Sequence, residues 1–202
     1  MRLLSRVVAP ALLALAVGGC SLGGMLGGGG KAPATLLTLT PEAPPTGEFT
    51  RSASAGQAVT IGTPVISKEL RTVRIPVRIS PTDVQYVTDV QWVDTPDRLF
   101  GGLLAETIRR TTNRVVLDPA LTGLDPGLIV SGELQSFGYD AAIGQAVVRF
   151  DGALSTAGGT RVETRRFEAT VPSDGSAASI GPALNRAANE VAAKVATWVG
   201  NG

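Results

Sequence analysis

Residues 128–171 read LIVSGELQSFGYDAAIGQAVVRFDGALSTAGGTRVETRRFEATV, and this stretch decides the fold. Apolar and polar residues alternate in three runs, which is the period of strands with one buried face. The inward positions are Leu128, Val130, Gly132 and Leu134, then Ala146, Val148, Phe150, Gly152 and Leu154, then Phe167, Ala169 and Val171. Residues 140–144 and 157–160 supply turns. We therefore predict an antiparallel meander that is covered on one side.

Two amphipathic helices flank this meander. The first begins with Thr95 as N-cap and Pro96 at the first helical position, followed by Asp97 at the positive end of the helix dipole. Its apolar stripe comprises Leu99, Phe100, Leu103, Leu104, Thr107 and Ile108, and Glu106 and Arg110 form an i,i+4 pair on the wet side. The second helix is expected from about Pro182 to Val199, with Gly200 as its stop.

The adjacent glycines Gly101 and Gly102 lie inside the first helix, where each costs about 1 kcal/mol relative to alanine. We expect a close approach of this helix to the sheet to compensate for that cost. A pair of glycines in a helix interior otherwise has no local advantage.

Several short strands are expected before and between the helices. They cover residues 36–39, 58–61, 73–79, 88–92 and 115–117, and residues 41–57 are a loop rich in Pro, Ser, Thr, Ala and Gly. Pro76 cannot donate a ladder hydrogen bond, so it indicates an edge strand or a bulge. Together these elements predict an α/β or α+β fold, in which a mixed sheet with the antiparallel meander is covered by the two amphipathic helices.

The composition excludes several classes of function. The 202-residue chain has a formal net charge of +1, no histidine and one cysteine. A near-neutral chain gives no reason to expect nucleic-acid binding. Zinc, copper or iron sites built from His or Cys, a Ser-His-Asp triad and an internal disulfide all lack their residues. We expect no cofactor, no metal and no catalytic residue.

The single cysteine, Cys20, ends a short apolar leader. Arg2 and Arg6 precede eleven residues, 7–17, which suit a signal-peptide core and fall short of the roughly 20 apolar residues that span a bilayer. The sequence VGGC at residues 17–20 resembles the bacterial lipobox, whose cysteine is acylated, although Gly18 replaces the more usual Ala, Ser or Thr. The alternative is an ordinary secreted protein with a chance cysteine.

These features divide the chain into three parts. We expect a lipoprotein signal peptide at residues 1–19, a flexible lipid-anchored tether at residues 20–35, and one domain at residues 36–202. Glycine-rich composition is typical of flexible linkers, and the third part is long enough to bury a core.

Four segments in this order resemble the ABC-type transport auxiliary lipoprotein family, which includes paraquat-inducible protein C. They are LTLTP at residues 37–41, VRIPVRISP at residues 73–81, VQWVD at residues 90–94 and VSGELQSF at residues 130–137. The resemblance covers nearly the whole domain after the leader. Members often carry a bulkier, Tyr-containing segment near residues 76–86, where this chain has PTDVQY at residues 81–86.

The resemblance implies a fold similar to the N-terminal domain of TolB and a role without ATP hydrolysis or other chemistry. It implies a lipid-anchored periplasmic docking component of an ABC system with an Mce-domain protein, a permease and an ATPase, which moves phospholipids or other hydrophobic molecules between membranes. The anchor implies palmitate or a related acyl group on Cys20. Ser21 follows the lipidated cysteine and favours the outer membrane over the inner one.

Other residues have both a functional and a structural interpretation. Trp92 and Trp198 could contact a partner or a lipid, but large aromatic side chains are mostly buried, and for Trp92 we expect packing on Leu99 or Phe100. The basic pairs Arg109–Arg110 and Arg165–Arg166 could meet anionic headgroups, although such pairs are usually solvated surface. Asp140, Asp151, Glu163 and Glu168 could supply acid–base carboxylates, but they fall mainly in turns or on outward strand positions.

Three hypotheses of function follow. The first is the non-enzymatic accessory of a lipid-transport ABC system. The second is an envelope scaffold that binds peptidoglycan or another envelope protein and has no transport role. The third is a lipid-binding enzyme, such as an esterase that lacks the usual residues. An open strand edge near Pro76 would also allow a homo-oligomer.

Overall fold

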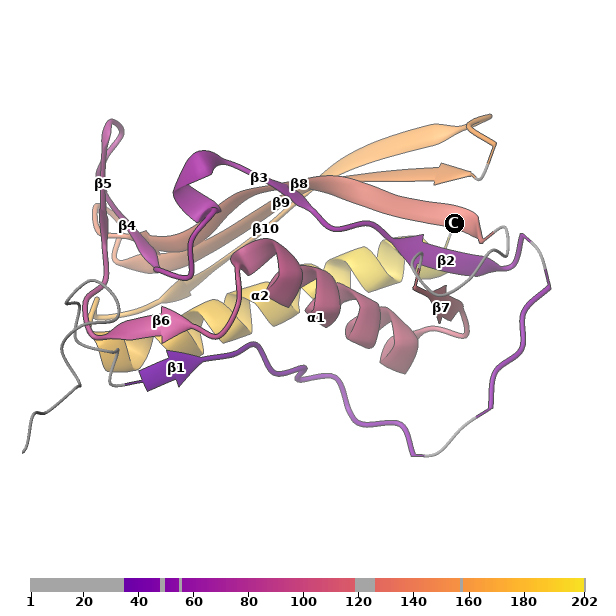
Figure 1. Ribbon diagram of the computed structural model, residues 1–202, viewed down its shortest axis with the longest axis horizontal. Helices are drawn as coiled ribbons and strands as arrows, with labels where there is room; N and C mark the ends of the chain where they lie inside the picture. Colours follow the sequence, from indigo (N-terminus) through magenta and orange to yellow (C-terminus); the bar gives the residue numbers. More distant parts are fainter. Residues whose placement is uncertain (1–34, 48–49, 55, 119–125, 157, 202) are drawn as a thin grey trace, which may run out of the picture. The chain divides into compact units, whose positions relative to one another are not determined.

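The computed structural model describes residues 35–47, 50–54, 56–118, 126–156 and 158–201. Their elements are β1 (Thr35–Leu37), β2 (Ala58–Ile61), β3 (Val65–Ile66), the short 3₁₀ helix η2 (Lys68–Leu70), β4 (Pro76–Ser80), β5 (Asp83–Tyr86), β6 (Val90–Trp92), α1 (Pro96–Thr111), β7 (Val115–Leu117), β8 (Gly127–Asp140), β9 (Gln145–Thr156), β10 (Val162–Pro172) and α2 (Ala177–Gly200). The predicted class, a mixed sheet with two covering helices, is confirmed (Figure 1).

The long strand β8 organises an eight-stranded sheet. On one side it pairs antiparallel with β9, which pairs with β10, so the predicted meander is confirmed. On its other side three short strands follow one another along β8, and β2, β3 and β4 all run parallel to it. β7 extends the sheet beyond β2, and β5 pairs only with β4.

A bulge in β8 changes which of its side chains are buried. Leu134 pairs with Phe150, but Ser136 pairs with Arg149, so Gln135 is an extra residue. After it, the inward position falls on Phe137, which is 1% exposed and breaks the alternation of the four inward residues before it. Because the bulge depends on pairing with another strand, the period of β8 alone did not predict it.

Both helices cover one face of the sheet, and the core lies between them and the sheet (Figure 1). Phe100 of α1 packs edge-on against Phe150 of β9, and Trp198 of α2 packs on Phe167 of β10. Gly132 and Gly152 face each other across β8 and β9. A Cβ on Gly132 would lie 2.7 Å from the Phe150 ring, so these glycines leave room for the aromatic side chains.

The second helix begins earlier than the sequence pattern indicated. α2 starts at Ala177, with Ser176 as N-cap, and Pro182 lies inside it. The Ser176 hydroxyl accepts from the Ser179 N–H at 3.3 Å, which satisfies one of the free donors of the first turn. The expected stop, Gly200, is the last helical residue, and the C-cap is Asn201.

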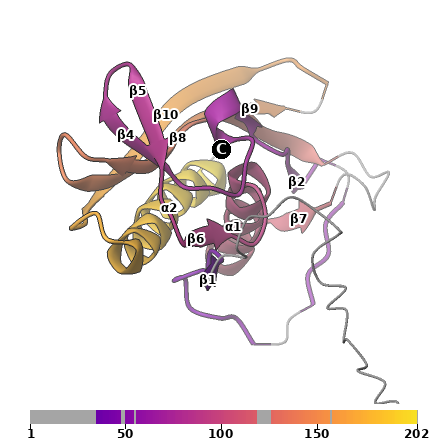
Figure 2. The same cartoon turned by 60° about the vertical axis from the view of Figure 1, so that its left-hand side comes forward.

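The prediction of a strand at residues 73–79 is also only partly confirmed. β4 begins at Pro76, a first-residue position where a missing N–H is tolerated, and a separate strand β5 folds back on it. Ile79 is 41% exposed, so the alternating residues do not share one buried face. The reason is that the β4–β5 hairpin stands away from the sheet on the side opposite the helices (Figures 1 and 2).

The first described strand, β1, pairs in parallel with β6 to form a separate two-stranded sheet. Leu37 of β1 packs at α2, where a Cβ on Gly181 would lie 2.9 Å from the leucine side chain. Thr35, expected at the end of the tether, already belongs to β1. β6 leads into α1, so this small sheet ties the start of the domain to both helices.

The expected close approach of α1 to the sheet does not explain Gly101 and Gly102. A Cβ on Gly101 would lie 3.4 Å from Pro64, in the link between β2 and β3, and one on Gly102 would meet nothing within 4 Å. Neither glycine therefore marks a close approach to a strand. Across the described residues, neither helix is both long and apolar enough to cross a bilayer.

Candidate functional site: a cleft beside the β4–β5 hairpin

A hairpin stands over the sheet face that the helices leave open. β4 pairs with β8 only at Val77 with Tyr139 and Arg78 with Asp140. Beyond these pairs it continues with β5 alone, and the register shifts between Arg78 and Ser80. Because a bulge bends its strand, the hairpin leaves the plane of the sheet. A corner results between the hairpin and the open face of β8, β9 and β10.

This corner holds a cleft of about 520 Å³. Its lining is Glu69, Pro76, Arg78, Ser80, Pro81, Val84, Gln135, Ser136, Phe137, Gly138, Tyr139, Asp140, Ala142, Ile143, Val147, Arg149, Glu168 and Thr170. Ile143 is 56% exposed although it is apolar. The size falls in the range of about 300–1,000 Å³ that small-molecule sites occupy, and it would also accept side chains of a partner protein.

Two ion pairs lie among the residues that line the cleft. Arg78 lies 3.7 Å from Glu69, and Arg149 donates to Glu168 at 2.5 Å. The hydrogen bond from Arg149 lowers the pKa of Glu168, so this carboxylate stays ionised well below neutral pH. Half-exposed ion pairs contribute only about 0–1 kcal/mol, so these groups mainly orient one another and offer polar contacts at the cleft.

The predicted carboxylates are held by neighbours. Asp151 accepts two bonds of 2.6 Å from Arg166, and this hydrogen bonding lowers the pKa of Asp151. Asp140 accepts from the Ala142 N–H at 3.0 Å, and Glu163 accepts from Trp198 at 2.7 Å. A general acid needs a raised pKa, so the paired carboxylates do not have the electrostatics of a glycosidase pair. Within the described residues, no group of three or more acidic, histidine or cysteine side chains could hold a metal.

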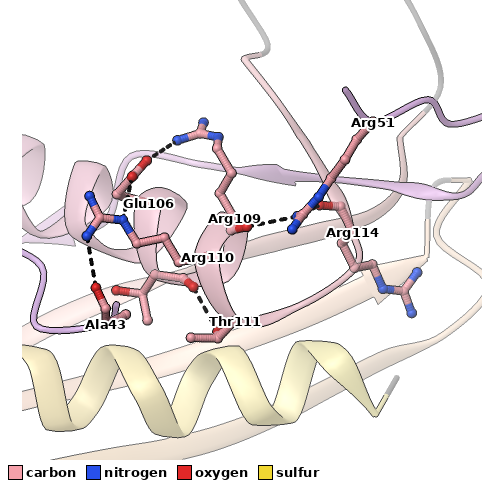
Figure 3. Close-up of polar contacts among 8 residues, drawn as sticks. Ala43, Arg51, Glu106, Arg109, Arg110, Thr111 and Arg114 are labelled. Atoms are coloured by element: carbon pink, nitrogen blue, oxygen red, sulfur yellow. Dashed lines mark hydrogen bonds and ion pairs between the residues drawn. The ribbon is translucent and has the colours of Figure 1, made fainter. Parts of the chain in front are cut away.

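The basic pair Arg109–Arg110 binds protein groups (Figure 3). Both side chains donate to Glu106, at 2.6 and 2.7 Å, which confirms the predicted i,i+4 pair of Glu106 with Arg110. Arg110 also donates to the Ala43 carbonyl at 2.9 Å, and Arg51 donates to the Arg109 carbonyl at 2.8 Å. These bonds fasten the segment between β1 and β2 to α1.

Two asparagines of α2 fasten the same segment. We call residues 38–47 the strap. Asn189 accepts from the Glu42 N–H at 2.8 Å and donates to the Thr40 carbonyl at 2.9 Å, and Asn185 accepts from the Thr40 N–H at 2.8 Å. The two side-chain amides satisfy backbone groups of the strap as a neighbouring strand would.

Both tryptophans lie in the core, as expected. Trp92 is 1% exposed, and its ring packs on Phe137 at 5.4 Å between centroids, whereas we had expected Leu99 or Phe100 as partners. Trp198 is 7% exposed and keeps its indole N–H bonded to Glu163. Both are therefore packing residues. The predicted acylation site, Cys20, lies outside the described residues, as does the rest of residues 1–34.

Comparison with known proteins supports the family resemblance. The profile of the ABC-type transport auxiliary lipoprotein component family matches residues 37–196, which is most of the chain. The chain belongs to this family. A search of curated proteins finds no match.

Solved structures share the fold of this auxiliary lipoprotein component. A Xanthomonas campestris protein is 18% identical with a TM-score of 0.70, and the match covers 83% of this chain and 95% of that one. An uncharacterised protein is 12% identical with a TM-score of 0.61, over 74% and 96% of the two chains. At these identities the similarity shows the fold alone.

The cleft itself was not predicted for this auxiliary lipoprotein component. Members of the family often carry a bulkier segment near residues 76–86, and β4 and β5 occupy this stretch in the present chain. The exposed Ile143 in the turn after β8 was the signal that sequence reasoning missed. A single exposed apolar side chain is common on protein surfaces, so Ile143 gains meaning only from the cleft that it lines.

Proposed function

We propose that the protein is a non-enzymatic, lipid-anchored accessory of an Mce-type ABC system that moves phospholipids or other hydrophobic molecules between the inner and outer membranes. One observation carries the proposal: the family profile spans residues 37–196, which is nearly the whole domain that follows the leader. Its partners in this proposal are an Mce-domain protein and the permease and ATPase of the same system.

The leader supports an envelope location. In this proposal Cys20 is acylated, with palmitate or a related chain, and holds the domain at a membrane facing the periplasm. Ser21 favours the outer membrane. Replacing Cys20 by Ser tests the anchor: fatty-acid incorporation and recovery in the membrane fraction should both be lost. Unchanged incorporation in the Cys20→Ser variant would contradict the anchor.

The electrostatics of the open face support a binding role without catalysis. Asp151 and Glu168 are ionised and paired with Arg166 and Arg149. Such pairs present fixed charges to a partner, and the pKa of both Asp151 and Glu168 is lowered, whereas a general acid at neutral pH requires a raised pKa. We place the contact with the transport system at the cleft, because exposed apolar side chains lie there beside both signs of charge.

Site-specific photocrosslinking tests this assignment. Ile143, which lines the cleft, and Val93, which is 52% exposed and does not line it, are each replaced by p-benzoylphenylalanine in the intact cell envelope. Position 143 should form an adduct with the Mce-domain protein or the permease, and position 93 should not. Adducts of position 143 only with peptidoglycan or with other envelope proteins would instead favour the scaffold function.

A further inference from the structure

The last strand of the sheet, β10, has one edge without a strand partner in the described part of the chain, since it pairs only with β9. The Thr156 N–H donates to the Arg161 carbonyl at 3.1 Å, and the Ser173 N–H donates to the Gly144 carbonyl at 3.1 Å. In an antiparallel pair, bonded residues alternate along each strand. The odd-numbered residues of β10 therefore bond to β9, and the even-numbered ones direct their N–H and C=O groups to the free edge.

Most of this edge is open. Lys194 of α2 donates to the Glu168 carbonyl at 2.7 Å, which occupies one edge acceptor. For the edge groups of Val162, Thr164 and Arg166, no hydrogen bond exists within the described residues. Three successive edge residues with free donors and acceptors match the backbone of another strand.

A hollow of about 670 Å³ lies along the same edge, between β10 and the C-terminal half of α2. Its apolar lining includes Leu154, Phe167 and Trp198. Its charged lining is Arg161, Arg165, Arg166, Lys194, Glu163 and Glu168, which gives a formal net charge of +2. The two acidic groups already have partners, because Glu163 accepts from Trp198 and Glu168 pairs with Arg149.

Arg165 is the basic group best placed for a new partner. Its guanidinium lies 5.5 Å from the centre of the Phe167 ring, and no carboxylate of the described residues pairs with it. It points to the helix side of the sheet, as Phe167 does, because odd-numbered residues share that face. An incoming acidic side chain would therefore reach Arg165 while its backbone pairs with the edge.

We infer that the β10 edge binds an extended acidic segment of a partner protein, which adds to the sheet beside β10. The free backbone groups of Val162, Thr164 and Arg166 recognise the extended backbone, and the positive hollow selects acidic side chains. An anionic lipid could meet the same arginines, but its headgroup lacks the regular series of N–H and C=O groups that pairs with a strand edge. The inference goes beyond the proposed function, because it concerns another edge of the sheet and does not depend on the transport system.

Thr164→Pro separates the backbone contact from the charge. The N–H of Thr164 faces the free edge, so a proline there removes one edge donor without removing a bond to β9. Thr164→Ala keeps that N–H and is the matched control. Arg165→Glu reverses the charge and leaves the backbone edge intact, which keeps the test open if the proline variant unfolds. Thermal unfolding of each variant shows which ones retain the fold.

The probes are two end-blocked heptapeptides, one alternating Glu with Val and the other alternating Lys with Val, added to the full-length chain. The Glu peptide should bind at least tenfold more tightly than the Lys peptide and should slow hydrogen exchange at the Thr164 and Arg166 amides. Thr164→Pro and Arg165→Glu should each weaken binding at least fivefold, whereas Thr164→Ala should leave it unchanged.

Several results would overturn the inference. These are equal binding of the two peptides, no protection of the two amides, or full affinity in Thr164→Pro. Binding to phosphatidylglycerol vesicles that needs Arg165 and survives Thr164→Pro, without peptide binding, would assign the hollow to lipid headgroups. A concentration-dependent dimer that Thr164→Pro abolishes, again without peptide binding, would assign the edge to a second copy of this chain.

Discussion

Replacing Gly132 by alanine should destabilise the domain strongly, because the new methyl group has no space. Its Cβ would lie 2.2 Å from the Asp151 carbonyl oxygen and 2.7 Å from the Phe150 ring, while φ at this position is +154°. The first contact is with backbone and cannot be relieved by rotating a side chain. Overpacking of this kind costs about 1–3 kcal/mol, and strain at an unfavourable φ adds about 1 kcal/mol. We expect a total loss of about 3 kcal/mol.

A loss of this size is large against the typical stability of about 5–15 kcal/mol. For a domain of this length it lowers Tm by roughly 6–12 °C. The assay is urea and thermal unfolding of the purified protein, followed by circular dichroism. The matched control is Gly102→Ala, which meets nothing within 4 Å on an exposed helix face and should stabilise by about 1 kcal/mol.

The comparison of these two glycines would refute the reasoning in one clear case. If the free energy of unfolding of Gly132→Ala lay within about 0.5 kcal/mol of that of the unchanged protein, β8 and β9 would separate easily at this point. The close contact between the strands would then not be a constraint on the sequence.

Three further predictions concern the strap, pH and the core. Asn189→Ala leaves the Glu42 N–H and the Thr40 carbonyl without their partner and should cost about 1–3 kcal/mol, with faster hydrogen exchange at Glu42; unchanged exchange would contradict the clamp. Hydrogen bonds from Ser179 and Ser176 lower the pKa of Asp174 from 3.8 to about 2, so its stabilising effect is full above pH 4 and is lost as the pH falls toward 2. Asp174→Asn should therefore show a smaller drop in urea midpoint between pH 5 and pH 2, and an equal drop would disprove this role. Trp92→Ala should cost about 3–5 kcal/mol in urea unfolding, and a loss below 1 kcal/mol would show that its site collapses freely.

The sequence predicted those elements whose signal is local. The meander follows from alternation within each strand, and α1 follows from its cap residues and apolar stripe. The parallel pairing of β2, β3 and β4 with β8 joins residues far apart in the chain, so no local pattern contains it. The bulge at Gln135 depends on the register with β9 in the same way.

The candidate site was harder to predict than the fold. The stretch of residues 73–79 has the alternation of a half-buried strand, but β4 leaves the sheet after two pairs with β8, and that departure creates the cleft. Arg110 looked like a solvated residue, because its bond to Ala43 joins α1 to a distant loop. Side-chain bonds to distant backbone groups have no sequence period, so they become visible only in the folded chain.

The strap has a mechanical consequence. Tension applied at Thr35 would pass first into the three register pairs of β1 with β6, and then into the amide clamps of Asn185 and Asn189 on α2. The long ladder of β8 with β9 lies beyond these contacts. In a single-molecule pulling experiment from this end, the strap should peel off as an early, small extension while the rest of the sheet still holds. Under tension the domain would thus release the strap as a short extra length of chain, and the strap would bind α2 again when the tension ends.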